Sequence, residues 1–503
     1  MRSKKALYNI VTNLLLQIII VIYGFIVPKI IISNFGSNVN GLISSITQFL
    51  GYIVLLESGF GPVVKSMLYK PIAQRDKKEI ASILRASSRF FKKIAIIFIL
   101  YIVILVIIYP LLVNNEFDSI YTITLLLIIS ISTFAEYFFG MTYKLYLQAE
   151  QKTYVTSLIQ IITYILSIVL IILLVKVNVS VHIIKLTTAL VFILRPILQN
   201  VYVKKKYSID LNLGEKNYKI EKKWDGLAQH VAYVIHSNTD VTILTIFCNL
   251  AEVSVYSVYY MIVNGIKSII QAFSNGIDAS FGDMLAKEEN EKLNKSFDLY
   301  EIMYNSICTI IYSCTFVLIV PFVSIYTKDI FDVNYVRYIF GFFIVLGEYI
   351  WAIRLPYSTL TLAAGHFKET RKGALLEAGS NIVISLILVG KYGIIGVVIG
   401  TSFAMFIRTI EFIYHVNKYI LKRSIFLSIK KIILIIIETG IILVSCNYFI
   451  HFDELTYFRW IITAVIVFLY SCIITIGINA IFYHKSYREV IEIGKNILKR
   501  KKK

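Results

Sequence analysis

Long apolar runs alternate with short polar segments along the whole chain. Fourteen of these runs approach or exceed the ~20 residues that a helix needs to cross the hydrocarbon core of a bilayer. Their expected limits are 7–33, 40–63, 92–113, 119–140, 154–176, 181–202, 226–248, 254–285, 299–326, 337–363, 373–390, 393–417, 426–449 and 458–483. The pattern predicts an all-α polytopic membrane protein with about 14 transmembrane helices.

Composition supports this prediction. Hydrophobic residues make up 57% of the 503 residues and charged residues only 16%, whereas a soluble domain has roughly a quarter charged residues. The five cysteines are scattered, mostly within apolar runs, so we interpret them as apolar packing residues rather than metal ligands. The residue patterns indicate no metal site and no cofactor.

The net charge of +20 is distributed as in a membrane protein, and so we expect no nucleic-acid partner. Lysine and arginine gather in alternate connections, such as 64–93 and 204–223, while the intervening ones are short and neutral or acidic, such as NFGSNVN and HFDEL. Basic connections stay on the cytoplasmic side. The alternation therefore predicts a multi-pass protein of the cytoplasmic membrane with both termini in the cytoplasm.

Two pairs of similar segments hint at an internal duplication. VNGLISSITQF (39–49) resembles VNGIKSIIQAF (263–273), and YLQAEQKTY resembles TLAAGHFKETR, with six spans between the members of each pair. Repeats of this kind are common in transporters, which handle substrate at the interface between them. We therefore expect two six-helix lobes in a pseudo-twofold arrangement, followed by two further helices. The expected parts are an N-terminal lobe (1–203), a basic cytoplasmic linker (204–225), a C-terminal lobe (226–420), two extra transmembrane helices (421–484) and a basic tail (485–503).

Polar residues recur at helical spacing within several of the apolar runs. A charge at the bilayer centre costs about 2.5–3.5 kcal/mol on insertion scales, so such residues should face a bundle interior or a water-filled cavity. The alternative is that small and polar residues simply hold helices together. The residues of these stripes that we expect to line a substrate cavity are Gln17, Gln48, Asp240, Asn264, Lys267, Gln271 and Asp278.

Three arginines lie in the inner parts of expected spans: Arg195, Arg354 and Arg408. Because arginine stays charged and binds phosphate bidentately, these groups could attract an anionic headgroup from the cytoplasmic leaflet. Local pairing is the alternative: Glu411 follows Arg408 by three residues, a spacing that permits an intrahelical ion pair, and Glu136 has a depth similar to that of Arg195. A second alternative is that the arginine side chains extend along the helix and place their charged ends in the headgroup region of the inner leaflet.

Several of these segments resemble bacterial polysaccharide exporters. LLESGFGPVVKSMLYKPIAQRDKKEI (55–80) is similar to the second-span motif of that family, LQAEQKTY (147–154) to the motif after its fourth span, and HVAYVIHSNTDVTILTIF (230–247) to its seventh span. The longest match is residues 354–401. The family is the lipid-linked oligosaccharide flippases, which include O-antigen and capsular polysaccharide exporters of the multidrug/oligosaccharidyl-lipid/polysaccharide superfamily.

The resemblance implies a transport function rather than an enzyme. Members move undecaprenyl-pyrophosphate-linked oligosaccharides from the inner to the outer leaflet of the bacterial cytoplasmic membrane, by alternating exposure of a polar cavity between two lobes. It also implies membrane lipids as partners, with a polysaccharide polymerase and other envelope-assembly proteins as further candidates. Arginines are scarce in the outer halves of the first two spans, where related peptidoglycan-precursor flippases carry them, which argues against a lipid II substrate.

Three alternatives stay open from the sequence. The first is a cation-coupled small-molecule antiporter, for which Asp240, Asp278 and Glu57 could supply the carboxylates. The second is a membrane-embedded polymerase or ligase, although the short external connections leave little room for a catalytic loop. The third is a nonenzymatic scaffold for envelope assembly.

Overall fold

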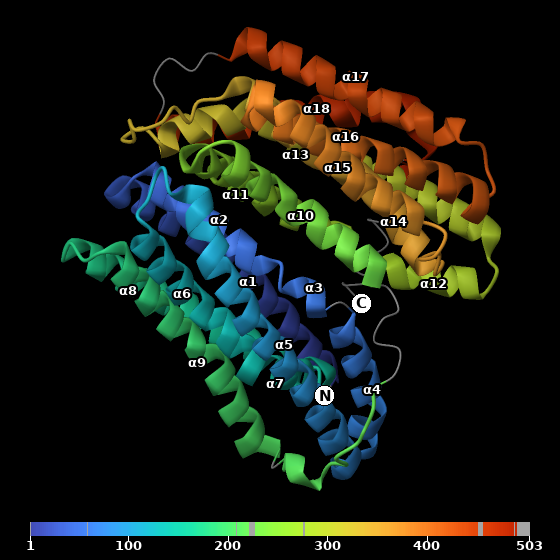
Figure 1. Ribbon diagram of the computed structural model, residues 1–503. Helices are drawn as coiled ribbons and strands as arrows, with labels where there is room; N and C mark the ends of the chain where they lie inside the picture. The colour runs from blue at the N-terminus through green and yellow to red at the C-terminus, as the bar shows by residue number, and fades with distance from the viewer. Residues whose placement is uncertain are drawn as a thin grey trace. The chain divides into compact units, whose positions relative to one another are not determined.

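The computed structural model describes residues 2–57, 59–207, 209–220, 227–274, 277–450, 456–486 and 488–489. Within these ranges every regular element is a helix (Figure 1). The first elements are α1 (Arg2–Phe35), α2 (Ser37–Gly51), α3 (Val54–Glu57), α4 (Phe60–Gln74), α5 (Lys77–Val113), α6 (Ser119–Ala135), the π-helical turn η1 (Glu136–Gly140), α7 (Met141–Ala149), α8 (Thr153–Lys176), α9 (Val181–Tyr207), the short 3-10 turn η2 (Leu211–Leu213) and α10 (Leu227–Phe247). The others are α11 (Leu250–Ser274), α12 (Ile277–Ala286), α13 (Asn290–Tyr326), α14 (Tyr338–Ala363), α15 (Arg371–Tyr392), α16 (Ile394–His415), the π-helical turn η3 (Val416–Ile420), α17 (Phe426–Phe449) and α18 (Tyr457–Phe482).

The all-helical, multi-pass architecture expected from the sequence is confirmed. Among the described residues, 12 helical segments are long and apolar enough to cross a membrane. The two other expected spans, 226–248 and 426–449, are also helical: they form α10 and α17, of 21 and 24 residues, but are not among the twelve. All fourteen expected spans therefore correspond to helices, of which twelve qualify by length and composition.

Two compact units make up the chain, Met1–Ser257 and Val258–Lys503, so that the division falls inside α11. Each unit is described by itself below. The lobe boundaries expected at residues 203 and 226, and the pseudo-twofold arrangement, stay predictions.

One expected span is interrupted rather than continuous. The expected span 40–63 consists of α2, α3 and the beginning of α4, and Gly59 before α4 has a left-handed φ of 75° that a residue with a side chain rarely adopts. The expected span 254–285 includes α11 and α12, and residues 275–276 between them lie outside the described ranges.

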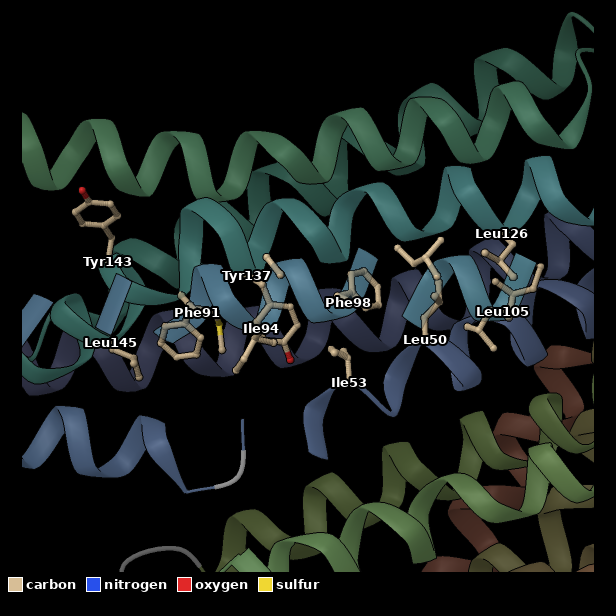
Figure 2. Close-up of a cluster of buried hydrophobic side chains, with 14 of the residues drawn as sticks. Leu50, Ile53, Phe91, Ile94, Phe98, Leu105, Leu126, Tyr137, Tyr143 and Leu145 are labelled. Carbon is tan, nitrogen blue, oxygen red and sulfur yellow. The ribbon is translucent and has the colours of Figure 1, made fainter. Parts of the chain in front are cut away.

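The core of the first unit is built along α5, which runs past several other helices of that unit (Figure 1). Figure 2 shows Phe91, Ile94, Phe98 and Leu105 following one another along this helix, at spacings that keep them on one face. All four side chains are buried. Helix α5 is thus the central packing surface on which the neighbouring helices of this unit bury their apolar sides.

The described part of the basic linker lies against α5. Arg85 on α5 donates a hydrogen bond to the carbonyl of Gly214 at 2.9 Å, and the backbone N–H of Glu215 donates to the hydroxyl of Ser82 at 2.8 Å. A Cβ at Gly214 would lie only 2.5 Å from the carbonyl carbon of Ala81, so the approach requires glycine. The linker is thus fixed to the first unit over the segment that follows α9.

A cluster of four charged side chains fastens α17 to α13 in the second unit. Lys431 lies 2.6 Å from both Asp298 and Glu301, and Arg423 lies 2.6 Å from Asp298 and 3.2 Å from Glu301. Glu301 is completely buried and also accepts a hydrogen bond from the hydroxyl of Tyr357. Two acids and two bases balance one another, which a buried group of ions requires. We call these four residues the balanced cluster.

Candidate functional site

A ladder of polar side chains joins α2 to α10 and α11 within the first unit. The polar positions of α2 recur every three to five residues and so share one face of the helix. Four hydrogen-bonded pairs form this polar ladder: Asn40–Ser254, Ser45–Thr245, Gln48–Asn238 and Tyr52–Thr242. The donor–acceptor distances of the first, second and fourth pairs are 2.7–2.9 Å. The stripe on which Gln48 was predicted therefore makes helix–helix contacts in this structure.

Glycine allows the two elements to approach closely at the end of the ladder. A Cβ at Gly41 would lie 1.8 Å from the carbonyl oxygen of Leu250, the first residue of α11. Gly41 and Leu250 are both buried. The backbone contact, and not only the polar ladder, holds α2 against the beginning of α11.

Asp240 lies on α10 and is also buried, with only 5% of its surface exposed. Its carboxylate accepts a hydrogen bond of 2.9 Å from the hydroxyl of Tyr256 on α11. A buried carboxylate needs such donors because it has lost its hydration. Asp240 therefore connects α10 to α11 in this structure.

Lys267 on α11 is paired with an acid, Glu348, that the sequence pattern did not single out. Its ammonium nitrogen lies 3.0 Å from a carboxylate oxygen of Glu348 on α14 and 4.4 Å from the ring centre of Trp351. Glu348 is buried, with 6% exposed. An aromatic face and a carboxylate together stabilise an ammonium group in a poorly hydrated place.

Arg354 and Arg408, two of the predicted headgroup-binding arginines, share a single acid. Arg354 on α14 donates to Glu377 on α15 at 2.6 Å, and Arg408 on α16 lies 3.5 Å from the other oxygen of Glu377. Arg408 also pairs with Glu411, which confirms the intrahelical ion pair that the spacing permitted. Two arginines and two glutamates again balance, so these cations are neutralised inside the second unit.

Arg195 differs from the other two arginines. It lies on α9, donates a hydrogen bond of 2.7 Å to the hydroxyl of Thr163 on α8, and has its guanidinium 4.2 Å and 3.7 Å from the rings of Tyr164 and Phe192. No carboxylate among the described residues forms an ion pair with it, and one of its terminal nitrogens is buried without a hydrogen-bond partner. Glu136, which was considered as its partner, pairs instead with Lys144 at 3.1 Å.

Four further residues that were predicted to line a substrate cavity have exposed side chains in this structure. No hydrogen bond or ion pair joins their side chains within the described ranges, and Asp278 on α12 accepts a hydrogen bond from the backbone N–H of the next residue, Ala279, at 2.9 Å. These exposed residues are Gln17 on α1, Asn264 and Gln271 on α11, and Asp278 on α12. Their assignment to a substrate cavity stays a prediction.

Sequence reasoning overlooked acids whose partners are distant in the chain. These acids are Glu301, Glu348 and Glu377. Glu348 stands alone in an apolar run, and an isolated acid in such a run is by itself a signal of a functional or paired residue. No group of three or more histidine, cysteine, aspartate or glutamate side chains in the described ranges could hold a metal ion. The described chemistry is therefore that of buried ion pairs and hydrogen bonds.

Comparisons with known proteins found similar structures but no similar sequences. No protein-family model matches the chain, and no curated protein matches it in sequence. Among solved structures, the chain is similar to the lipid II flippase MurJ in an inward closed conformation, with a TM-score of 0.66 and 15% identity over 95% of this chain and 99% of that one.

Two further similar structures are transporters. A multidrug resistance MATE family transporter of the MOP superfamily, in an inward-facing conformation, aligns with a TM-score of 0.62 and 14% identity over 80% of this chain and 96% of that one. A eukaryotic MATE transporter aligns with a TM-score of 0.55 and 13% identity over 86% and 98%. At these identities the likeness establishes the fold. The chain is a multi-pass membrane protein with the fold that the lipid II flippase MurJ shares with the MATE transporters.

Proposed function

We propose that the chain is a flippase that moves undecaprenyl-pyrophosphate-linked oligosaccharide repeat units from the cytoplasmic to the outer leaflet, by alternating access, for the synthesis of a cell-surface polysaccharide. It acts in the bacterial cytoplasmic membrane, with both termini in the cytoplasm. A polymerase and other envelope-assembly proteins would act on what it delivers. Of the transporters with this fold, one that handles a lipid needs a place for a long apolar chain.

The observation that carries this proposal is an apolar cavity in the second unit. It has a volume of about 690 Å³ and lies among α13, α14, α16 and α17. Its walls are formed by side chains such as Phe342, Phe406, Ile433 and Ile436, and the few polar groups come from threonines and Tyr349. Binding to such a wall is favourable for an apolar group, because apolar surface is removed from water, and is not favourable for a hydrated solute. A polyprenyl chain fits this chemistry.

The likeness to MurJ supports the same choice, because it extends over nearly all of both chains, while the likeness to the MOP-superfamily MATE transporter leaves a fifth of this chain uncovered. The substrate that we propose is an oligosaccharide repeat unit on its lipid carrier rather than lipid II. The family resemblance in residues 55–80 and 354–401 is to polysaccharide exporters, and the arginines of lipid II flippases are scarce in the first two spans.

A cation-coupled small-molecule antiporter is the second candidate. The MATE structures favour it, and so does a partly buried carboxyl at the end of α3: Glu57 accepts a hydrogen bond of 3.4 Å from the hydroxyl of Tyr137. A polymerase or a nonenzymatic scaffold has no specific support from the described side chains.

Deletion of the gene tests the proposal. We expect loss of the surface polysaccharide, with complete lipid-linked repeat units accumulating in the inner leaflet, as measured by surface staining and by mass spectrometry of extracted lipids. Normal polysaccharide with altered sensitivity to toxic cations would instead establish the antiporter. Flipped but unpolymerised units in the outer leaflet would identify a polymerase.

We expect Arg195→Gln to reduce export by about 10- to 100-fold without lowering protein abundance. A hydrogen bond to a charged group contributes about 1.5–3 kcal/mol, and each 1.4 kcal/mol corresponds to a tenfold change in binding. We assign the pyrophosphate to Arg195 because no carboxylate within the described ranges neutralises it, whereas Arg354 is paired with Glu377. The buried guanidinium nitrogen must become exposed during the transport cycle to make this contact.

The matched control is Arg354→Gln. It should lower protein abundance or thermal stability, because it removes one partner from a buried ion pair. Quantified surface polysaccharide, normalised to the amount of protein in the membrane, separates the two effects. Normal export by the Arg195 variant would remove this arginine from the substrate site.

A further inference from the structure

Glu438 lies in the middle of α17, and its side chain is completely buried. One carboxyl oxygen accepts a hydrogen bond of 2.7 Å from the amide of Asn479 on α18. The second oxygen is buried and has no hydrogen-bond partner among the described atoms, and neither does the buried hydroxyl of Thr475, one helical turn before Asn479. The α17–α18 contact thus contains an acid and a hydroxyl whose hydrogen-bonding capacity is not filled.

Among the described residues of the second unit, the other buried glutamates, Glu301 and Glu348, and the half-buried Glu377 have cationic partners. Glu301 has Lys431 and Arg423, Glu348 has Lys267, and Glu377 has Arg354 and Arg408. No ion pair with Glu438 occurs among the described residues, and its hydrogen-bonding partner is a neutral amide. An isolated ion in such a place costs several kcal/mol, and an acid avoids this cost by binding a proton.

The charged groups near Glu438 do not supply a countercharge. Lys431 lies two turns away on α17 and belongs to the balanced cluster, where two bases already face two acids. The titratable groups that interact with Glu438 are Tyr349 from α14 and Tyr483 directly after α18; Cys308 on α13 lies near Tyr349, and Glu301 on α13 near Tyr483. Burial above all, together with the nearby Glu301 carboxylate, raises the pKa of Tyr483 to about 12, so this tyrosine is neutral.

We propose that Glu438 is a proton-binding site that holds α17 against α18 as long as its carboxyl group is a neutral acid. When the site releases its proton, the O–H bond breaks, its electron pair stays on the carboxylate, and the proton passes to water. The carboxylate that remains has no cation to pair with, so it needs water between the two helices. Proton release and loosening of the α17–α18 contact therefore occur together.

The position of Glu438 connects this site to the apolar cavity. The next two residues, Thr439 and Gly440, line that cavity, and the hydroxyl of Thr439 lies 3.1 Å from that of Tyr349, which lines it as well. A change in the packing of α17 therefore changes a wall of the cavity. Protonation of Glu438 would control access to it, whatever apolar ligand the cavity holds.

Infrared difference spectroscopy of the purified full-length protein in lipid nanodiscs tests the proposal without any substrate. At neutral pH we expect the carbonyl band of a protonated carboxyl group, shifted by ¹³C-labelled glutamate, absent in Glu438→Gln and moved to a different frequency in Glu438→Asp. Gln keeps the acceptor for Asn479, so this variant should fold. Alkaline pH should abolish the band and increase the hydrogen exchange of α17 and α18.

The matched control is Glu348→Gln, which removes a buried glutamate that has a lysine partner and should leave the band unchanged. A spectrum at neutral pH in which Glu438→Gln removes only a carboxylate signal would overturn the proposal, because the group would then be ionised. A protonated band that appears only when sodium is replaced by choline would also overturn it and assign the site to sodium. Neither result depends on whether the protein transports oligosaccharides.

Discussion

Replacing Gly41 with leucine is expected to destabilise the first unit by about 3 kcal/mol or more, since overpacking of a close contact costs about 1–3 kcal/mol even for small additions. The new Cβ would meet the carbonyl oxygen of Leu250 at 1.8 Å, and a backbone atom cannot turn aside as a flexible side chain can. Helix α2 must then move away from α11, and the polar ladder must open. A lower melting temperature in detergent and faster hydrogen exchange in α2 would measure this.

Gly265→Leu on α11 is the matched control. A Cβ at this position would have no atom within 4 Å, so the substitution meets open space. Within a helix interior, replacing glycine by a better helix former is favourable by up to about 1 kcal/mol. The two glycine variants should therefore change stability in opposite directions. Equal melting temperatures for Gly41→Leu and the wild type would contradict the close contact.

The second large effect is expected for Lys431→Met, which should lower the free energy of unfolding by about 3–5 kcal/mol, the usual cost of removing one partner from a buried ion pair. Methionine keeps much of the apolar stem, so the loss reports on the charge. Asp298 and Glu301 would then share Arg423 alone, leaving one excess negative charge beside a completely buried carboxyl. Thermal unfolding followed by tryptophan fluorescence measures the change.

Lys430→Met is the control, because the neighbouring lysine is exposed and has the same charge and length. Combining Lys431→Met with Glu301→Gln should recover part of the lost stability, since the second change removes the unpaired acid. If Lys430→Met and Lys431→Met were equally stable, the balanced cluster would not fasten α17 to α13.

The helical architecture could be predicted from the sequence because a membrane imposes a strong and simple rule on it. A helix satisfies all of its backbone hydrogen bonds within one segment, so apolar runs of sufficient length become helices. The interruption before α4 was harder to predict. The break before α4 depends on the left-handed conformation of Gly59, and glycine in an apolar run is otherwise compatible with a continuous transmembrane helix.

The candidate site was predictable only along each helix. Spacing gives the face on which a side chain lies, and for this reason the Arg408–Glu411 pair could be anticipated. It does not give the partner on another helix: 81 residues separate Lys267 from Glu348, and Glu377 bridges Arg354 and Arg408 from two different helices. The arginine that the structure leaves without an acid, Arg195, could not be distinguished from the other two by periodicity.

The π-helical turn η1 between α6 and α7 predicts how related sequences should differ in length at this position. A turn of this kind holds one residue more than an ordinary turn, and it places Lys144 within 3.1 Å of Glu136 although eight residues separate them. Deleting one residue there would restore a regular helix but rotate everything after it by about 100°. Related chains should therefore differ here by a one-residue insertion or deletion, and those without the extra residue should lack this ion pair.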